Sequence, residues 1–369
     1  MAVNLKIRQL ESDLAAEFYI SAVPEGKIPL QKQAQEIFSA ITDTLRSKKA
    51  RILQERIFAS QKAMETIHQV RLKTYRDLDD GVAPTFLICT KGMSGPVAAV
   101  QLHAVTADVR PEPINSEGRL CGRILRLPKR TYLTLSQISA PSFTQPIEQA
   151  KAMLEKAESI LKQFGTDFFS VPRTWMWLGD ILSWYDSFNN VRNKFFAERG
   201  IIGKGTRQSL PASTGIGLRP AAPAKCAMDL VAVLEPSDSI HYLPAVGKQQ
   251  CALEYGSAFS RASEAITPAG LTVFVSGTAS IDVTGATTNI GDPLGQINTT
   301  IENVRAVLKD MHCEDKHIMQ VVAYCKTAEV ENIFNSLKDT PPWPWVTVIC
   351  DICRPDLLFE IEATALLKS

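Results

Sequence analysis

The thirteen-residue stretch QINTTIENVRAVL, at positions 296–308, belongs to a pattern that occurs three times in the chain. A glutamine is followed twelve residues later by a leucine, as also in QAQEIFSAITDTL (33–45) and QAKAMLEKAESIL (149–161). The apolar residues between them recur at the spacing of one helix face, so each stretch predicts an amphipathic helix. An internal repeat of this kind indicates one structural unit present in three copies.

Extended apolar runs flank each predicted helix. In the third copy, VFVSG (273–277) precedes the helix and MQVVAYCK (319–326) follows it. A strand that begins with proline comes next, at Pro84, Pro211 and Pro344 in the three copies, and a final apolar strand closes each copy. Each copy therefore predicts the order β-β-α-β-α-β-β, an α+β unit with two helices packed on one face of a sheet.

Segments rich in turn-forming residues separate the copies. They predict three units, at 1–110, 118–236 and 245–369, of which the first is the most degenerate. Three similar units in one chain predict a closed pseudo-trimer, in which each sheet buries a face against its neighbours as the subunits of a cyclic trimer do. We expect the chain to be a monomer of this kind or a homo-oligomer.

Length and composition exclude several classes of protein. The 369 residues include 40 Lys and Arg against 39 Asp and Glu, a balance that argues against binding to nucleic acid or to an anionic membrane. No apolar run reaches the ~18 residues of a membrane-spanning helix, and the first residues lack the apolar core of a signal peptide. Eight cysteines are too few for a disulfide scaffold, so we expect a cytoplasmic protein with free thiols.

The sequence contains no convincing metal or cofactor motif. Cys350 and Cys353 form a C-x-x-C pair without a second pair, and the five histidines form no ligand pattern. The glycine-rich stretch 285–295 matches no phosphate-binding loop. We therefore expect neither a metal nor a cofactor.

Several motifs carry a resemblance to a known family. VSG at 275–277, the helix around Gln296, PAST at 211–214, EIEA at 360–363 and FSRA at 259–262 resemble motifs of the RidA/YjgF superfamily. Single-unit members are homotrimers with clefts between subunits, and many hydrolyse enamines or imines of amino acids. The resemblance implies three RidA/YjgF-like (chorismate mutase-like) units in one chain.

One departure from this family bears on the chemistry. Its imine deaminases carry an arginine two residues after the strand-leading proline, where it holds the substrate carboxylate. The matching positions here are Phe86, Ser213 and Val346, so no copy keeps the arginine. Imine deamination is therefore the weaker expectation.

The chorismatases offer a closer resemblance, because they are single chains built like a RidA trimer. RTW at 173–175 and FSR at 259–261 are similar to chorismatase segments. That group cleaves the enolpyruvyl ether of chorismate with a glutamate near the C-terminus, and in some members a cysteine seven residues earlier steers the reaction toward 3-hydroxybenzoate. Glu360 and Cys353 stand seven residues apart. The resemblance implies that both are catalytic.

Comparison of the copies supports Glu360 independently. The matching positions hold Ala99 and Ala227, so an acid present in one copy alone indicates one working site in the third unit. The apolar residues around Glu360 would raise its pKa by burial and make it a proton donor near neutral pH. The alternative is a solvent-facing acid, because Glu362 lies on the same face of the predicted strand. For Cys353 the alternative is a small buried hydrophobe.

Cationic and aromatic residues near the expected cleft are candidates for binding an anionic substrate. Arg173 lies in an apolar strand and is expected to face inward, whereas Arg192 is expected on a solvated helix face. The substrate-binding candidates are Arg261, Arg173, Phe259, Ser276, Gly277, Tyr324 and Lys326.

The sequence thus predicts a chorismatase-like enzyme that cleaves the enolpyruvyl ether of chorismate or a related carboxylate and releases pyruvate, with Glu360 as general acid. A small anionic metabolite is the expected partner. Two alternatives stay open: a RidA-like enamine or imine deaminase, and a non-catalytic protein that binds a small metabolite.

Overall fold

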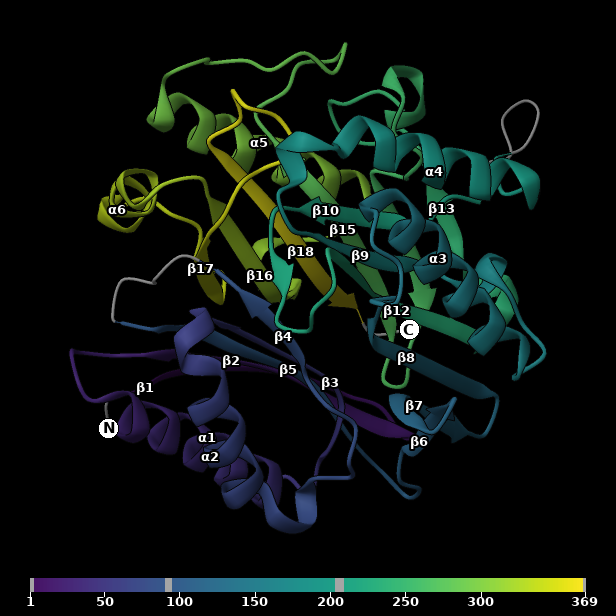
Figure 1. Cartoon of the computed structure of the whole chain (residues 1–369), viewed down its shortest axis with the longest axis vertical. Coiled ribbons are helices and arrows are strands. Elements are labelled where there is room, and N and C mark those ends of the chain that lie inside the picture. Colours follow the sequence, from purple (N-terminus) through teal and green to yellow (C-terminus); the bar gives the residue numbers. More distant parts are fainter. Residues whose placement is uncertain (1–2, 90–94, 203–208, 368–369) are drawn as a thin grey trace.

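The computed structural model describes residues 3–89, 95–202 and 209–367. These residues form three mixed sheets of six strands each, and two α-helices accompany each sheet (Figure 1). The α+β class with three sheet-plus-two-helix units is confirmed. Among the described helices, none has the length and apolar character needed to cross a membrane.

The first two sheets have these elements. The strands of the first sheet, in order across it, are β1 (Val3–Glu11), β2 (Ala15–Pro24), β5 (Val97–Ala107), β3 (Arg51–Ala59), β4 (Thr85–Ile88) and β11 (Arg219–Pro220). Its helices are α1 (Leu30–Ser47) and α2 (Met64–Tyr75). The strands of the second sheet are β10 (Ala212–Ile216), β9 (Arg173–Leu178), β12 (Cys226–Glu235), β8 (Arg130–Ile138), β7 (Arg119–Leu127) and β6 (Glu112–Ser116). Its helices are α3 (Pro146–Lys162) and α4 (Tyr185–Glu198).

The third sheet repeats the central order of the other two. Its strands are β13 (His241–Leu243), β14 (Ala262–Ile266), β15 (Leu271–Ala279), β18 (Phe359–Leu367), β16 (Ile318–Cys325) and β17 (Trp345–Ile349), and its helices are α5 (Pro293–Asp310) and α6 (Ala328–Ser336). In every sheet the last long strand of the unit lies between two antiparallel partners, and a parallel pair follows: β3 with β4, β9 with β10, or β16 with β17. The repeat in the sequence is therefore a repeat in topology.

The repeated leucines and glutamines have different structural roles. Leu45, Leu161 and Leu308 are buried between their helix and their own sheet, as the helical periodicity predicts. The side-chain oxygen of Gln149 accepts a hydrogen bond from the backbone N–H of Lys225 at 2.7 Å, and that of Gln296 accepts one from Leu358 at 2.7 Å. Each glutamine thus holds the chain just before the central strand of its sheet.

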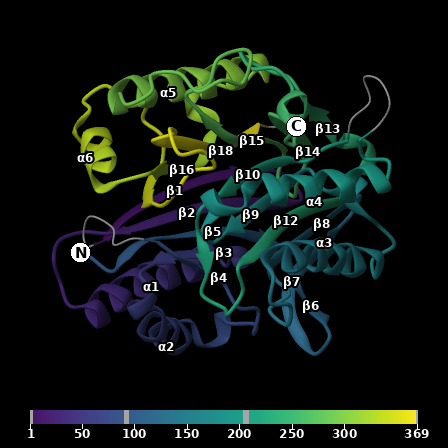
Figure 2. The ribbon, with the colours of Figure 1, turned by 45° about the horizontal axis from the view of Figure 1, so that its top comes forward.

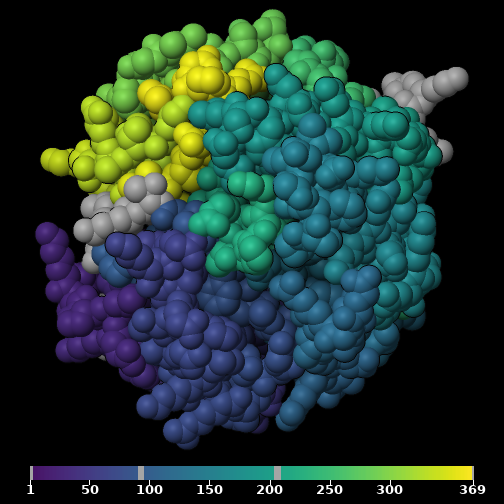
Figure 3. Space-filling view, viewed as in Figure 1, coloured from purple at the N-terminus to yellow at the C-terminus, as the bar shows by residue number. Residues whose placement is uncertain are grey.

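The faces opposite the helices meet in one shared apolar cluster. It includes Phe58 from the first sheet, Trp177 from the second and Phe274 from the third. The helices consequently lie on the outside of the molecule, and the three units pack around a common interior (Figures 1 and 2). The segment that carries β11 leaves the second unit and pairs with β4 of the first, so the surfaces of the units interlock (Figure 3).

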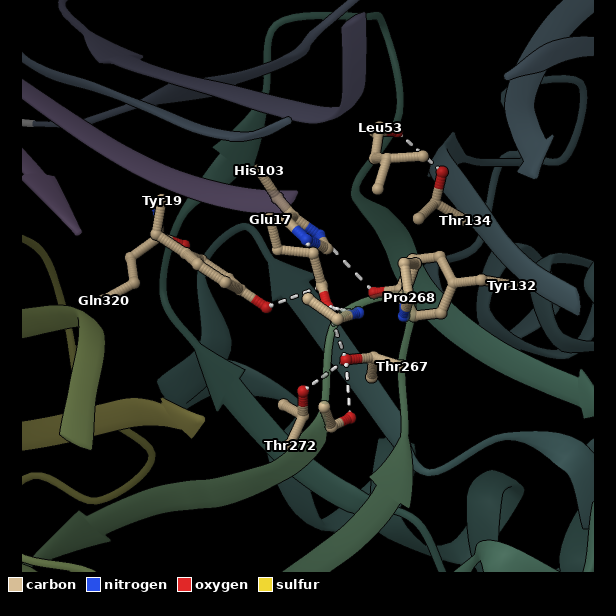
Figure 4. A network of polar contacts seen from close by, with 12 residues as sticks. Glu17, Tyr19, Leu53, His103, Tyr132, Thr134, Thr267, Pro268, Thr272 and Gln320 are labelled. Atoms are coloured by element: carbon tan, nitrogen blue, oxygen red, sulfur yellow. Dashed lines mark hydrogen bonds and ion pairs between the residues drawn. The ribbon is translucent and has the colours of Figure 1, made fainter. Parts of the chain in front are cut away.

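A buried polar cluster also joins the three units (Figure 4). Glu17 of β2 accepts hydrogen bonds from the hydroxyl of Thr267 at 2.8 Å and from the N–H of Ala269 at 2.6 Å. Nε2 of His103 lies 2.7 Å from the other Glu17 oxygen, and the hydroxyl of Tyr132 lies 3.5 Å from Nδ1 of the same ring. A carboxylate inside this interior therefore finds partners in a neighbouring unit.

Replacing either glutamine should destabilise the fold. In Gln296→Ala and Gln149→Ala a partly buried backbone N–H loses its acceptor, and each change should lower the free energy of unfolding by about 1 kcal/mol. Urea unfolding measures this, with Gln69→Ala as a control because Gln69 is exposed. An unchanged unfolding midpoint in Gln296→Ala would contradict the role given to this side chain.

Candidate active site

A cavity lies where the second and third units meet. Ala212 of β10 bridges to Ser260. The hydroxyl of Ser276 accepts a hydrogen bond from the N–H of Ser213 at 2.8 Å and donates one to the carbonyl of Ser260 at 2.6 Å. These bonds join the edge of one sheet to the next. The space beside them opens to solvent and is lined by residues of both units, and its empty volume with the open mouth included is about 540 Å³.

Glu360 reaches this cavity because residue 277 has no side chain. A Cβ atom on Gly277 would lie 2.1 Å from Oε1 of Glu360, so the carboxyl group occupies the place of the missing side chain. The pairing of β15 with β18 is irregular between Val275 and Thr278, directly beside this contact. The alternative that Glu360 faces solvent is wrong, because only 4% of the residue is exposed.

Burial raises the pKa of Glu360 to about 8, and the nearby charge of Glu362 adds to this effect. The positive charges of Arg173, Arg354 and Arg261 oppose it. Near neutral pH the Glu360 carboxyl is therefore mostly protonated and can donate a proton, which an exposed glutamate cannot do at that pH.

Three arginines face the same cavity. Arg261 donates to the carbonyl of Gln250 at 2.9 Å and to the hydroxyl of Tyr255 at 2.6 Å, and Arg354 donates to the carbonyl of Gly285 at 2.6 Å. Each is held by neighbouring groups of its own unit. With Arg192 from the second unit they give the cavity a positive character that suits an anionic ligand.

Arg192 departs from the expectation of a solvated helix face, which was wrong. It is 1% exposed and its guanidinium lies 5.3 Å from the Phe188 ring and 5.7 Å from the Phe259 ring. Position 192 is one turn after Phe188 and so belongs to the buried stripe of α4. Nη2 donates to Asn189 at 2.7 Å, whereas Nε and Nη1 make no hydrogen bond within the described residues. Both atoms are buried, and the guanidinium also interacts with Tyr185 on the cavity wall.

Cys353 lies on the cavity wall. Burial and the nearby Glu360 charge raise the pKa of its thiol to about 12, so the sulfur is a neutral thiol at physiological pH. Its segment is fixed by a hydrogen bond from Gly217 to the carbonyl of Asp351 at 2.8 Å, where a Cβ on Gly217 would lie only 2.5 Å from that carbonyl oxygen. The side chain is positioned beside the acid but is no thiolate nucleophile.

The other predicted site residues divide into two groups. Phe259 and Gly277 line the cavity with Arg261, whereas Ser276 lies behind the wall and uses its hydroxyl to join the two sheets. Tyr324 is buried in the shared apolar cluster, and Lys326 donates to the carbonyl of Pro355.

Arg173 also lies behind the wall, outside the cavity lining. It faces inward, as its apolar strand predicts, and Nη2 donates to Glu362 at 2.9 Å and to Thr214 at 2.7 Å. Its partner belongs to another unit, which the strand pattern around Arg173 cannot indicate.

Sequence reasoning missed Tyr185, Tyr255, Gly215 and Arg354. A Cβ on Gly215 would lie 3.4 Å from the Tyr185 ring, so the glycine lets the ring close one side of the cavity. Arg354 directly follows Cys353, and that position was a signal the sequence offered. Across the described ranges, no group of three His, Cys, Asp or Glu side chains could hold a metal ion.

The fold and the site together define a class: three similar units of one sheet and two helices in one chain, with a cavity that holds an acid and arginines between two of them. Residues 255–367 match the family model described as Endoribonuclease L-PSP. The chain is similar to the crystal structure of a chorismatase, with 18% identity, a TM-score of 0.61, and coverage of 85% of this chain and 93% of that one. The chain therefore has the chorismatase fold, which confirms the predicted resemblance to the chorismatases as far as the fold is concerned.

Single-unit structures match one third of the chain. A Rid-family protein, YyfA from Yersinia pestis, is 19% identical over 35% of this chain and 99% of its own, with a TM-score of 0.28. A YjgF-family member from Neisseria meningitidis is 18% identical over 35% and 96%, with a TM-score of 0.26. No curated protein matches the sequence.

A methyl group at position 277 should disturb the site. Gly277→Ala forces the Glu360 carboxyl away from β15 and should lower the free energy of unfolding by about 1–3 kcal/mol, as overpacking does. Gly215→Ala is the matched control in the same cavity lining, because its Cβ meets the Tyr185 ring at an ordinary 3.4 Å. Urea unfolding compares the two, and equal midpoints would contradict the close approach of Glu360.

Glu360 should also make stability depend on pH. Its pKa is raised from 4.5 to about 8 in the folded state, so between these values the folded chain binds more protons than the unfolded one. Stability from this group falls as pH rises through that window. Glu360→Gln should therefore raise the unfolding temperature at pH 9 relative to the wild type, and the gain should shrink at pH 5.

Calorimetry at the two pH values checks this, with Glu302→Gln as an exposed control. A stability gain in Glu360→Gln that is the same at both pH values would show that Glu360 has an ordinary titration.

Proposed function

We propose that this protein is a chorismatase-like enzyme that cleaves the enolpyruvyl ether of chorismate, or of a related carboxylate, and releases pyruvate. The observation that carries the proposal is a glutamic acid, protonated near neutral pH, in a cavity that also holds three arginines. Cleavage of an enol ether begins with protonation of carbon, and a substrate with two carboxylates needs cationic groups to hold it.

Glu360 supplies the proton in this proposal. The proton passes from its carboxyl to the methylene carbon of the enol ether, whose double-bond electrons form the new C–H bond. The ether carbon becomes an oxocarbenium ion, and the new Glu360 carboxylate stabilises that positive charge. In the hydrolytic route water adds to this carbon and returns a proton to Glu360, and the hemiketal then separates into pyruvate and the ring alcohol.

A second route ends in an aromatic ring. Loss of pyruvate with aromatisation converts chorismate into 3-hydroxybenzoate and pyruvate without net consumption of water, whereas hydrolysis consumes one water and leaves a dihydroxycyclohexadiene carboxylate. Cys353 is the residue we propose to select between them, because it lies on the cavity wall with Glu360 and stays neutral. We propose 3-hydroxybenzoate as the product, following the cysteine-containing chorismatases that the segment resembles.

Arg192 and Arg261 are the proposed carboxylate anchors. Both are buried, and they approach the cavity from different units, so they can hold two separate carboxylates. Arg192 is held by Asn189 and lines the cavity, and its planar guanidinium suits a carboxylate. The side chains of Phe259 and Leu357 supply apolar wall for a carbocyclic ring.

Glu360→Gln should abolish catalysis without loss of binding. The amide keeps the size of the side chain but carries no acidic proton, so turnover of chorismate should fall by about 10²-fold or more. Pyruvate is measured with a coupled assay, products by chromatography, and affinity by calorimetric titration. Wild-type turnover should decline as pH rises through about 8, where Glu360 loses its proton.

Two results would contradict this function. The first is wild-type protein that yields no pyruvate from chorismate, and the second is a Glu360→Gln variant with full turnover. Ammonia release from a 2-aminoacrylate-type substrate by the wild type would instead identify an enamine deaminase.

A further inference from the structure

Two acidic side chains project from the same face of β18 beside the cavity. Glu360 borders the cavity, and Glu362, two residues later, is 5% exposed and points toward the second unit. Oε2 of Glu362 accepts a hydrogen bond from Arg173 at 2.9 Å, and Oε1 accepts one from the indole N–H of Trp175 at 3.0 Å. Both donors lie on β9, so Glu362 is held as a carboxylate from across the boundary between units.

The seam between the first two units contains a matched arrangement. Asp229 of β12 lies opposite Trp175 of β9, and Glu362 of β18 lies opposite Val322 of β16. The two acids therefore have the same position in their sheets. Asp229 is bound by Arg56 at 3.1 Å, an arginine of the preceding unit. A buried ion pair at this position is therefore a structural tie that the scaffold uses twice.

The two ties differ in what lies beside them. Two residues before Asp229 stands Ala227, whereas two residues before Glu362 stands the acid Glu360. Asp229 also accepts from the hydroxyl of Thr85 at 2.7 Å and from the N–H of Gln137 at 2.8 Å. The tie in the third unit therefore places a fixed negative charge next to a carboxyl group, which the other tie does not do.

We infer that Glu362, held by Arg173 and Trp175, is a positioning residue that keeps the proton on Glu360. The inference rests on the proposed function, since it assigns a role in supplying the acid for that reaction. Like charges on neighbouring carboxyl groups disfavour ionisation of the one that has no dedicated cation. Glu362 has such a cation in Arg173, so Glu360 is the group that stays protonated.

Other charged and titratable groups face Glu360 from every side. Arg173 approaches from β9, Tyr185 from the start of α4 and Arg261 from the segment before β14. Cys350, Cys353 and Arg354 approach from the segment before β18. The arginines favour the ionised form, and burial together with Glu362 favours the protonated form. Removing the Glu362 charge leaves the arginine charges unopposed, so Glu360 should ionise at lower pH.

The decisive variant is Glu362→Gln. The infrared carbonyl band of protonated Glu360, identified by its loss in Glu360→Gln, should titrate about one pH unit lower than in the wild type. At pH 9 such a shift lowers the protonated fraction, and with it the turnover of chorismate, about tenfold. Glu362→Asp keeps the charge and should restore most of the wild-type titration.

Asp229→Asn is the matched control. It disrupts the equivalent tie, so it should lower stability, but it should leave the Glu360 band and the pH profile unchanged. Should Glu362→Gln not fold because Arg173 is left unpaired, the double variant Glu362→Gln, Arg173→Met leaves no unpaired buried charge. The Glu360 band of the double variant should shift in the same direction but by less. The Arg173 charge lowers the pKa of Glu360 by less than the Glu362 charge raises it.

A Glu360 band that titrates alike in the wild type, Glu362→Gln and the double variant would overturn the inference. An equal shift in Asp229→Asn would overturn it too, because the effect would then follow from a loosened scaffold. The infrared readout needs no substrate. A wild type whose band responds to Glu362 but that forms no pyruvate would therefore refute the function while leaving the charge coupling in place.

Discussion

Each sheet in this protein has helices on one face only, and the other face can be buried only by the two remaining sheets. Three apolar clusters lie between sheets and their own helices, and a fourth is shared by all three units. One unit alone would expose the shared face. Polar groups on that face must find partners in a neighbouring unit, as Glu17 does with Thr267 and Asp229 does with Arg56.

The same constraint creates the site. A carboxyl group at the edge of the shared interior lies away from water, and that burial is the main cause of the raised pKa of Glu360. Gly277 gives the carboxyl room, and Arg192 from the neighbouring unit adds positive charge to the cavity. The acid and its surroundings come from different units, so neither unit forms the cavity by itself.

The local pattern of apolar and polar residues in the sequence predicted much of this structure. It did not predict the contacts between units. Helical spacing was sufficient for the helix around Gln296. The apolar residues around Glu360 favoured burial but left a solvent-facing acid open, and the structure decides for burial. Short strands such as β11 have no alternation to detect. Arg192 belongs to the buried stripe of α4, although an arginine on a helix is usually assigned to the solvent-facing side. Arg173 pairs with Glu362, which is 189 positions away in the sequence.

In a single chain the three units can differ in sequence, whereas the subunits of a homotrimer cannot. A homotrimer must carry its catalytic acid in every cleft, and each buried acid with a raised pKa lowers stability above the ordinary pKa of a carboxyl group. Here Ala99 and Ala227 take the equivalent positions and pack into the shared apolar cluster. The buried acid at this strand position is thus confined to the third unit, where it stands beside the ion pair of Arg173 and Glu362.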